Sequence, residues 1–304
     1  MQEYSLGNVE RDLFTMAFSA KNLLLPLLLF PPILAAQPPL SGAGSAAFLA
    51  ADVQFTNNQA LRNVAGQLFA LGNQARAAQG LRALKWDPAL AAAALNHCVR
   101  MAAEGNISHQ YNGEPDLSQR AGQAGAHFSF LEENVAEGYA PAAIHQAWMH
   151  SPGHRENLLN PTVDRVGVAV VARGDMFYAV VDFEKAVQVL TREQVEAEVA
   201  NLVEATGVAA HGNSVGARLA CSQDHGMPAS LDNKRPEFIM RWQDAEIDRL
   251  PDALMDKIAS GRYHEAAIGS CPAQTRESTF TVYRVAVLLL KPESSGSRTY
   301  LSSK

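Results

Sequence analysis

Three residues have the side-chain types needed for a metal site or for acid–base chemistry: His109, Glu133 and His154. His109 lies in a polar loop after a helical segment, Glu133 lies in "LEENVAEG", and His154 lies in "HSPGHRENLL". Each falls at an expected boundary between elements, where functional side chains can face a cleft. Two neutral imidazoles and a carboxylate can hold Zn²⁺ with one coordination position open. A water bound at that position would have a lowered pKa.

Two simpler interpretations compete with a metal centre. Without a metal, the same groups can pair as imidazolium and carboxylate, each favouring the charged form of the other. They can also form a polar network that only joins loops to a sheet. His150 and His154 are four residues apart, but Pro152 and Gly153 interrupt that helix and no His-Glu-x-x-His is present. We therefore expect 151–153 to be a helix-ending turn and His150 to be a cation at the helix C-terminus.

The neighbouring residues favour structural roles. Asn134 and Asn157 are expected to bond to the backbone. His97 lies on the apolar face of a helix and is expected to be a buried structural histidine. Trp86 and Trp148 are predicted to anchor the core.

A second pattern, "GNSVG" at 212–216, matches the Gly-x-Ser-x-Gly nucleophile elbow around Ser214. Asp232 and His264 follow in hydrolase order. The motif is short, glycine is common, and the surrounding region is too small for the sheet that such an enzyme needs. A glycine-rich loop is the favoured interpretation.

The elements that must position the histidines and Glu133 alternate between helices and strands. Asp87 and Gly105 are typical N- and C-caps of a helix that starts at Pro88. Further helices are expected over about 55–80, 116–125 and 141–150, and strands over 128–139, 165–173 and 176–184, with a Gly174-Asp175 hairpin between the last two.

The region after about residue 187 is expected to form a smaller α+β domain. Thr191 and Gln194 make a capping box for an amphipathic helix. "PEFIMRWQ", "LPDALMDKIASGRY" and "FTVYRVAVLLL" read as strand, helix and strand. The sequence shows no internal repeat, and the tail from 293 to 304 is expected to be disordered.

Composition limits the classes of function. The chain has 304 residues, 47% of them hydrophobic, and a formal net charge of −6. It has enough apolar material for two modest domains. No run of Lys or Arg is present, so nucleic acid is not an expected partner.

The cysteines and the N-terminal segment bear on localisation. "KNLLLPLLLFPPILAAQ" has a basic residue followed by an apolar run of signal-peptide length. Residues 1–36 are expected to be a signal peptide or an uncleaved anchor, and 37–54 a linker. Cys98 is expected to be buried. Cys221 and Cys271 are able to pair if the chain is exported, but the sequence leaves this open.

Several blocks of the sequence resemble one known family. "NQARAAQGLRALKWD", "NISHQ", "EENVAEG", "HSPGHRENLL", "RVGVAV" and "YAVVDFE" follow the order and spacing of the CAP superfamily. That family includes cysteine-rich secretory proteins, antigen 5 and plant pathogenesis-related proteins. The resemblance covers about residues 60–186. It implies an α-β-α sandwich with a polar cleft that holds a divalent metal in some members.

The resemblance also implies roles for single residues. His109 and His154 match the two histidines of the cleft, and Glu133 matches its first acid. Glu114 is the candidate for the second acid, on a looser match. The family's usual Gly before "E-N" is Glu132 here, which departs from the pattern.

Together these observations predict an α+β chain with a CAP domain at 55–186 and a smaller α+β domain at 187–292. The expected function is a non-enzymatic binding module, secreted or in the periplasm or cell envelope. The expected metal is Zn²⁺ or another divalent cation, and the resemblance to the family further implies a lipid, sterol-like or cell-envelope ligand. Two alternatives are a metal-assisted hydrolase with Glu133 as base, and a cell-envelope interaction module whose C-terminal domain binds a protein partner.

Overall fold

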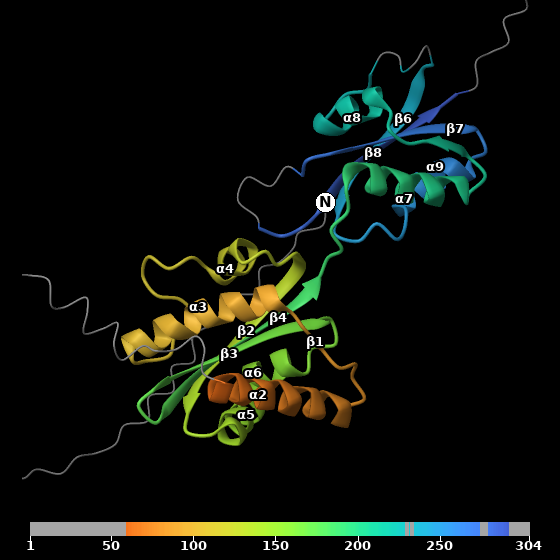
Figure 1. The fold of residues 1–304 in the computed structure, drawn as a ribbon. Helices are drawn as coiled ribbons and strands as arrows, with labels where there is room; N and C mark the ends of the chain where they lie inside the picture. Colours follow the sequence, from red (N-terminus) through yellow and green to blue (C-terminus); the bar gives the residue numbers. More distant parts are fainter. Residues whose placement is uncertain (1–58, 229–230, 232–233, 274–278, 292–304) are drawn as a thin grey trace, which may run out of the picture. The chain divides into compact units, whose positions relative to one another are not determined.

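The computed structural model of the protein describes residues 59–228, 231, 234–273 and 279–291 (Figure 1). The predicted signal or anchor segment, the linker and the C-terminal tail lie outside the described residues. Two four-stranded sheets are present, one within 55–186 and one within 187–292. The domain boundaries themselves stay a prediction.

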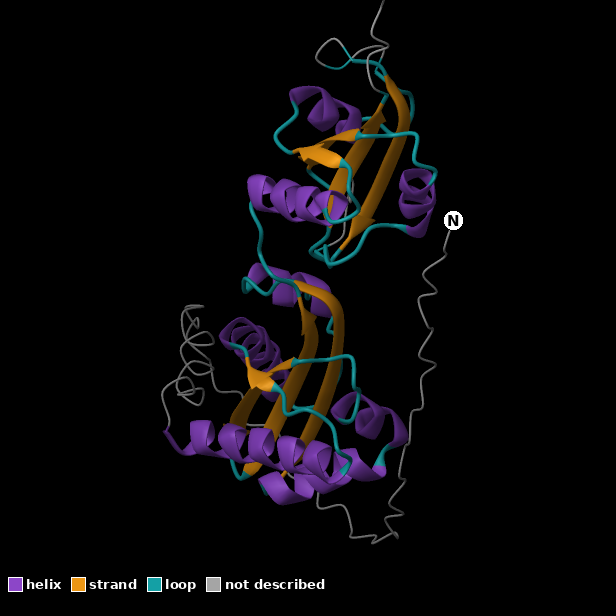
Figure 2. Ribbon diagram, turned by 90° about the vertical axis from the view of Figure 1, so that its right-hand side faces the viewer, coloured by secondary structure: helices purple, strands orange, loops and turns teal. Residues whose placement is uncertain are grey.

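The first sheet contains a long antiparallel core and one short parallel edge. Its strands are β1 (Lys85–Trp86), β2 (Phe128–Gly138), β3 (Arg165–Arg173) and β4 (Met176–Ala186), in the order β1-β3-β4-β2. Figure 2 shows the strands of both sheets in orange and the helices in purple. β1 runs parallel to β3, whereas β3 and β2 both run antiparallel to β4. β2 is therefore an edge strand.

Helices cover both faces of this sheet. α2 (Gln59–Ala78), α5 (Pro141–His150) and α6 (Pro152–Leu158) share a core cluster with one face, through residues such as Leu68, Trp148 and Leu158 (Figure 1). α3 (Pro88–Glu104) packs on the other face through Cys98 and Met101, next to α4 (Leu117–Gln123). The predicted α-β-α sandwich is confirmed.

Local sequence signals explain why α3 lies where it does. The Asp87 side chain accepts hydrogen bonds from the amides of Ala89 and Leu90, and Gly105 ends the helix with a φ of 76°. Gly167 on β3 allows the helix to approach, because a Cβ there would lie 2.1 Å from the amide nitrogen of Ala91. The backbone of α3 thus rests directly on the sheet.

Two local expectations were wrong. Ser151-Pro152-Gly153 does not only end a helix, because Pro152 is the first residue of α6. A proline is favourable at the first helical position. Trp86 is not a core anchor: it is 41% exposed and meets Phe69 edge to face. Trp148 is buried as expected and donates to the Val135 carbonyl.

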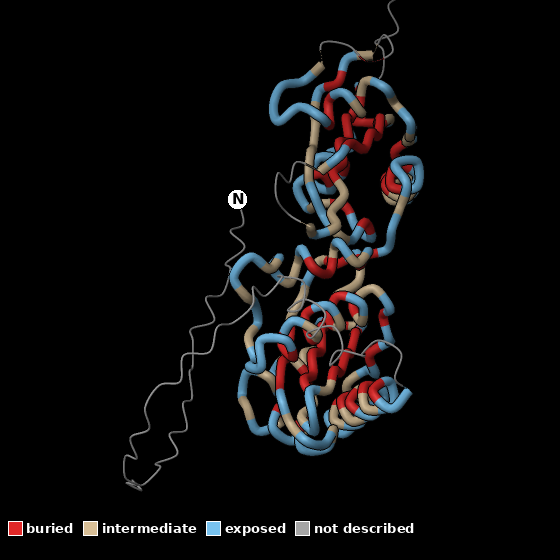
Figure 3. The backbone as a smooth tube through the Cα atoms, turned by 60° about the vertical axis from the view of Figure 1, so that its left-hand side comes forward, coloured by how far each residue is buried: buried red, intermediate tan, exposed pale blue. Residues whose placement is uncertain are grey.

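The second sheet is built from β5 (Ala209–His211), β6 (Pro236–Asp244), β7 (Glu265–Cys271) and β8 (Tyr283–Leu290), in the order β5-β7-β8-β6. α7 (Arg192–Glu204) and α9 (Asp252–Ala259) pack on one face, and α8 (Val215–Ser222) packs on the other. Figure 3 shows buried residues concentrated along the strands and the inner helix faces. Sequence patterns predicted α7, β6, α9 and β8, and missed the remaining elements.

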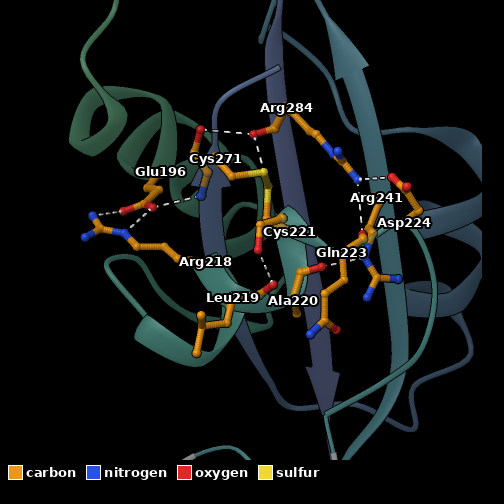
Figure 4. The surroundings of a disulfide bond; sticks show 12 residues. Glu196, Arg218, Leu219, Ala220, Cys221, Gln223, Asp224, Arg241, Cys271 and Arg284 are labelled. Carbon is orange, nitrogen blue, oxygen red and sulfur yellow. Dashed lines mark hydrogen bonds and ion pairs between the residues drawn. A yellow bond between two sulfur atoms is a disulfide. The ribbon is translucent and has the colours of Figure 1, made fainter. Parts of the chain in front are cut away.

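Cys221 and Cys271 form a disulfide that joins α8 to β7 (Figure 4). The pairing left open by the sequence is therefore made. Cys98 is a buried free thiol, as expected. Among the described residues, no helix is both long enough and apolar enough to span a membrane.

Candidate functional site

Glu133 is the centre of the candidate site, at the edge strand β2. Its side chain is 3% exposed. One carboxylate oxygen lies 2.8 Å from Nδ1 of His109, and the other accepts from Nη2 of Arg120 at 2.6 Å. Arg120, on α4, is also buried and donates to the carbonyls of His109 and Pro115. Sequence reasoning found two members of this cluster and missed the arginine.

The electrostatics of the cluster keep Glu133 charged. Burial acts to raise its pKa, but the hydrogen bond from His109 and the positive charge of Arg120 outweigh burial. The pKa of Glu133 therefore lies below its usual value. A carboxylate with a lowered pKa is a weak proton acceptor at neutral pH.

His154 lies on α6, which packs on the face of the sheet opposite to α3. It is close enough to His109 for the charge of His109 to affect it. Burial lowers the pKa of His154, and the charge of nearby His109 lowers it further. His154 is therefore neutral at pH 7. The His109 side chain, in contrast, is 60% exposed. His109 thus contacts Glu133 directly and is open to solvent, whereas His154 is linked to β2 through its backbone carbonyl, which accepts from Asn134.

Two side-chain amides, one buried (Asn134) and one half-buried (Asn157), hold α6 against β2. Asn134 donates to the backbone carbonyl of His154 at 2.9 Å. Asn157 donates to the Asn134 side chain at 2.9 Å and to the Glu133 carbonyl at 3.2 Å. The structural roles expected for both asparagines are confirmed, and their hydrogen bonds position the backbone at His154.

Glu114 does not reach His109. Its Oε1 lies 2.7 Å from Nδ1 of His97, and its Oε2 accepts from the Tyr111 amide. His97 is fully buried and also contacts the Ser108 carbonyl at 2.7 Å. His97 is thus structural, as expected. Together these bonds tie the loop that carries His109 to α3.

A second buried acid lies beside Glu133. Asp182 on β4 is directly opposite Glu133 in the strand register and has no exposed surface. Neither of its oxygens has a hydrogen-bond partner among the described residues. Burial and the charge of Glu133 raise the pKa of Asp182 well above the usual value, which favours its protonated form. The only sequence signal was a lone acid within an apolar strand.

Glu132, the residue that departs from the family pattern, belongs to the other face of the sheet. Its Oε2 accepts from the Asn160 side chain at 3.1 Å. Burial raises its pKa to about 7. Glu132 therefore contacts Asn160 on that face and lies apart from the His109–Glu133 cluster.

The donors around Glu133 are not arranged as a metal centre. Within the described ranges, no group of three His, Cys, Asp or Glu is arranged to hold one. Glu133 already uses both oxygens, one of them on a guanidinium. A cation bound to Glu133 would lie next to Arg120, which is electrostatically unfavourable. In this arrangement His109, Glu133 and His154 do not fit a three-ligand zinc centre.

The Ser214 elbow has a structural explanation. The Ser214 hydroxyl accepts from the Ala217 amide as the N-cap of α8. His264 is exposed, and Asp232 lies outside the described residues. The hydroxyl is thus occupied in helix capping.

The first sheet and the helices on its two faces form an α-β-α sandwich. The family model for the cysteine-rich secretory protein family, CAP, matches residues 69–183. This part of the chain is therefore a CAP domain. The family recognised from the sequence blocks is confirmed, and the match does not extend into the second sheet.

Curated relatives are bacterial proteins without an assigned activity. The uncharacterized membrane protein YlbC of Bacillus subtilis is 34% identical over 106 residues, which are 34% of this chain and 30% of that protein. The uncharacterized protein YkwD of the same organism is 32% identical over 111 residues, 35% of this chain and 42% of YkwD. The chain thus spans less than half of each.

Solved structures with a similar part include an outer surface protein of Borrelia burgdorferi, at 22% identity and a TM-score of 0.40, covering 44% of this chain and 98% of that one. Another is an extracellular SCP-domain protein of Bacillus anthracis, at 26% identity and a TM-score of 0.37, covering 49% of this chain and 45% of that one. Because both scores are below 0.5, the family assignment rests on the family model and the sequence blocks.

Proposed function

We propose that this protein is an extracytoplasmic, non-enzymatic binding module whose CAP domain presents His109 and His154 to a ligand at the edge of β2. The observation that carries this is the state of Glu133. Both of its oxygens are bonded, one of them inside a buried ion pair with Arg120. Glu133 therefore holds the His109 loop in place, and the exposed imidazole of His109 is left as the accessible group.

The same observation disfavours the alternative, a metal-assisted hydrolase with Glu133 as base. A general base needs a pKa near the working pH and a free oxygen within reach of the proton it removes. The pKa of Glu133 is lowered, and Arg120 covers one oxygen. If the wild type turned over ester or peptide substrates and Glu133→Gln abolished this activity, the result would support the hydrolase.

The ligand class follows from the imidazoles. Neutral His154 and exposed His109 can supply two nitrogen ligands to Zn²⁺ or a similar cation. Two protein ligands give weaker binding than a complete site, and water would fill the other positions. A lipid or sterol-like ligand stays a prediction. The apolar pocket beneath α2, about 10 Å³, has room for no more than one water.

The disulfide supports the proposed location. Disulfides form and persist in secreted and periplasmic proteins and are rare in the cytosol. Cys221 on α8 and Cys271 on β7 are bonded to each other, and both belong to one core cluster of the second half. This supports a secreted, periplasmic or cell-envelope protein.

Zinc titration by calorimetry tests the proposal. We expect weak binding by the wild type and at least a tenfold loss in the His109→Ala/His154→Ala variant. His150→Ala is the matched control, because His150 is exposed and caps the end of α5 through the Gln146 carbonyl. Equal zinc affinity in the wild type and the double variant would exclude the two imidazoles as the cation site.

The C-terminal domain gives a second candidate function, capture of a protein partner in the cell envelope. Its own sheet and core clusters, separate from those of the CAP domain, support an independent role. Deletion of 190–304 should remove partner capture and leave zinc binding by the CAP domain unchanged. Loss of both would argue against a separate role.

A further inference from the structure

The two sheets share one topology. In each, a short first strand pairs in parallel with the third strand, and the third and fourth strands pair antiparallel. The second strand pairs antiparallel with the other side of the fourth. The orders β1-β3-β4-β2 and β5-β7-β8-β6 are therefore the same order, read from two successive stretches of chain.

The helices repeat as well. α2 and α7 precede the first strand of their sheets, and α3 and α8 follow it on the opposite face. The α5–α6 pair and α9 both precede the third strand, and they return to the face covered by α2 and by α7. Element order, sheet order and face assignment thus agree, while α4 has no counterpart among the described residues.

Two equivalent contacts set the register between the halves. Asp87 caps α3 and donates its amide to the Val166 carbonyl; Ser214 caps α8 and donates its amide to the Ile268 carbonyl. In both halves the next strand residue is a glycine that lies against the helix backbone. A Cβ on Gly167 would be 2.1 Å from the amide nitrogen of the fourth residue after Asp87. A Cβ on Gly269 would be 2.2 Å from that of the fourth residue after Ser214.

We infer that residues 192–290 are a second, divergent copy of the CAP-domain fold, which keeps the scaffold and lacks the His109–Glu133 cluster. The family model stops at residue 183 and does not reach this copy. The first copy supplies the His109–Glu133 cluster. In the second copy the loop after α8 contains His225 and α9 contains no histidine, so the pair of histidines is not repeated there. A ligand held by His109 and His154 therefore belongs to the first copy.

The strand register shows which residues of the second copy lie at the positions of Glu133 and Asp182. Glu133 pairs with Asp182, which pairs with Gly167. At the same three places the second copy has Arg241, Ala286 and Gly269. Arg241 donates to the Ala220 carbonyl at 2.6 Å (Figure 4). It also donates to the Gly226 carbonyl at 2.7 Å. Glu133, which holds the His109 loop in the first copy, thus corresponds to Arg241, which holds the end of α8 in the second copy.

The disulfide lies at a position that alanines fill in the first copy. Cys221 is seven residues after its cap and Cys271 is two residues after its glycine; Ala94 and Ala169 are at the same offsets. Both alanines are buried in one core cluster, where α3 packs on β3. α8 has 8 residues against 17 in α3, so it has less surface to bury, and a covalent link offsets that loss.

This equivalence predicts a new disulfide in the CAP domain. The full chain with Ala94→Cys/Ala169→Cys, in a Cys98→Ala background, should contain two disulfides after air oxidation and no free thiol on denaturation. Cys98 is removed because its sulfur lies 3.9 Å from the Ala169 carbonyl and would compete. Peptide mapping of the oxidised chain identifies the pairs. The control Ala94→Cys/Val171→Cys, in the same background, displaces the strand position by two residues and should retain two free thiols.

Two results would overturn the inference: free thiols in a folded Ala94→Cys/Ala169→Cys chain, or equal oxidation of both cysteine pairs. If the cysteine variants do not fold, the paired glycines answer the same question. Gly167→Ala and Gly269→Ala should each lower an unfolding midpoint, whereas Gly153→Ala should not, because a Cβ there meets nothing within 4 Å. Tolerance of alanine at either paired glycine counts against the shared register.

Discussion

Replacement of Arg120 by methionine tests whether the buried ion pair holds the candidate site together. The Arg120 and Glu133 side chains are 5% and 3% exposed, and their contact is 2.6 Å. Removing one partner of such a pair leaves a buried charge without compensation, which costs about 3–5 kcal/mol. Arg120→Met also removes hydrogen bonds to two backbone carbonyls. We therefore expect a loss of at least about 3 kcal/mol in the free energy of unfolding at pH 7.5.

The pH dependence gives this experiment its sign. In the wild type the folded-state pKa of Glu133 is lowered, so its contribution is present above the unfolded pKa of about 4.3 and is lost as the pH falls through the folded value. Without Arg120, burial becomes dominant and the folded pKa rises. The variant should then lose least stability at low pH and most at high pH.

Urea unfolding at pH 5 and pH 7.5 measures both effects. Arg165→Met is the matched control, since Arg165 is 44% exposed and pairs with Asp87 at 3.2 Å. Such a surface pair contributes about 1 kcal/mol or less. A loss below about 1 kcal/mol in Arg120→Met, or a loss independent of pH, would refute the assigned role of the ion pair.

Two further predictions concern buried groups. Asp182 has a raised folded-state pKa, so it binds its proton more tightly in the folded protein, and stability falls as the pH rises above about 3.9 towards the folded pKa. Asp182→Asn should therefore be more stable than the wild type at pH 8, and urea unfolding should show a flatter dependence of the free energy of unfolding on pH. If the variant kept the wild-type pH dependence, Asp182 would not have a raised pKa in the folded protein. Cys221→Ser/Cys271→Ser opens a link with a sequence separation of 50, which costs about 4 kcal/mol in the chain-entropy model. Calorimetry should show a lower transition for the second sheet and an unchanged one for the CAP domain, and a shift of both would mean that the two do not unfold independently.

Much of the first domain could be predicted because its signals are local. Asp87 and Gly105 bound α3 through capping chemistry that a few residues determine. The apolar runs of β3 and β4 and the Gly174 turn between them specify a hairpin. The meeting of His109 and Glu133 was predicted only through the family resemblance, because 24 residues separate them in the chain.

The partners of the site residues could not be predicted, because each depends on contacts between distant elements. Nothing near Arg120 in the sequence shows that its guanidinium reaches Glu133, and nothing near Glu114 shows that it serves His97. Strand β7 could not be predicted because its segment, "EAAIGSC", has small residues and no alternation of apolar and polar residues. Both faces of this strand are buried.

The sequence by itself determined the family, the main helices and strands of the CAP domain, and the candidate residues His109, Glu133 and His154. Only the tertiary structure decided that Arg120 neutralises Glu133, that Asp182 lies buried beside it, and that the second sheet repeats the first. The physical reason is that sheet order and buried ion pairs are made between residues far apart in the chain. The two copies preserve backbone contacts at Gly167 and Gly269, while the side chains around those glycines have diverged.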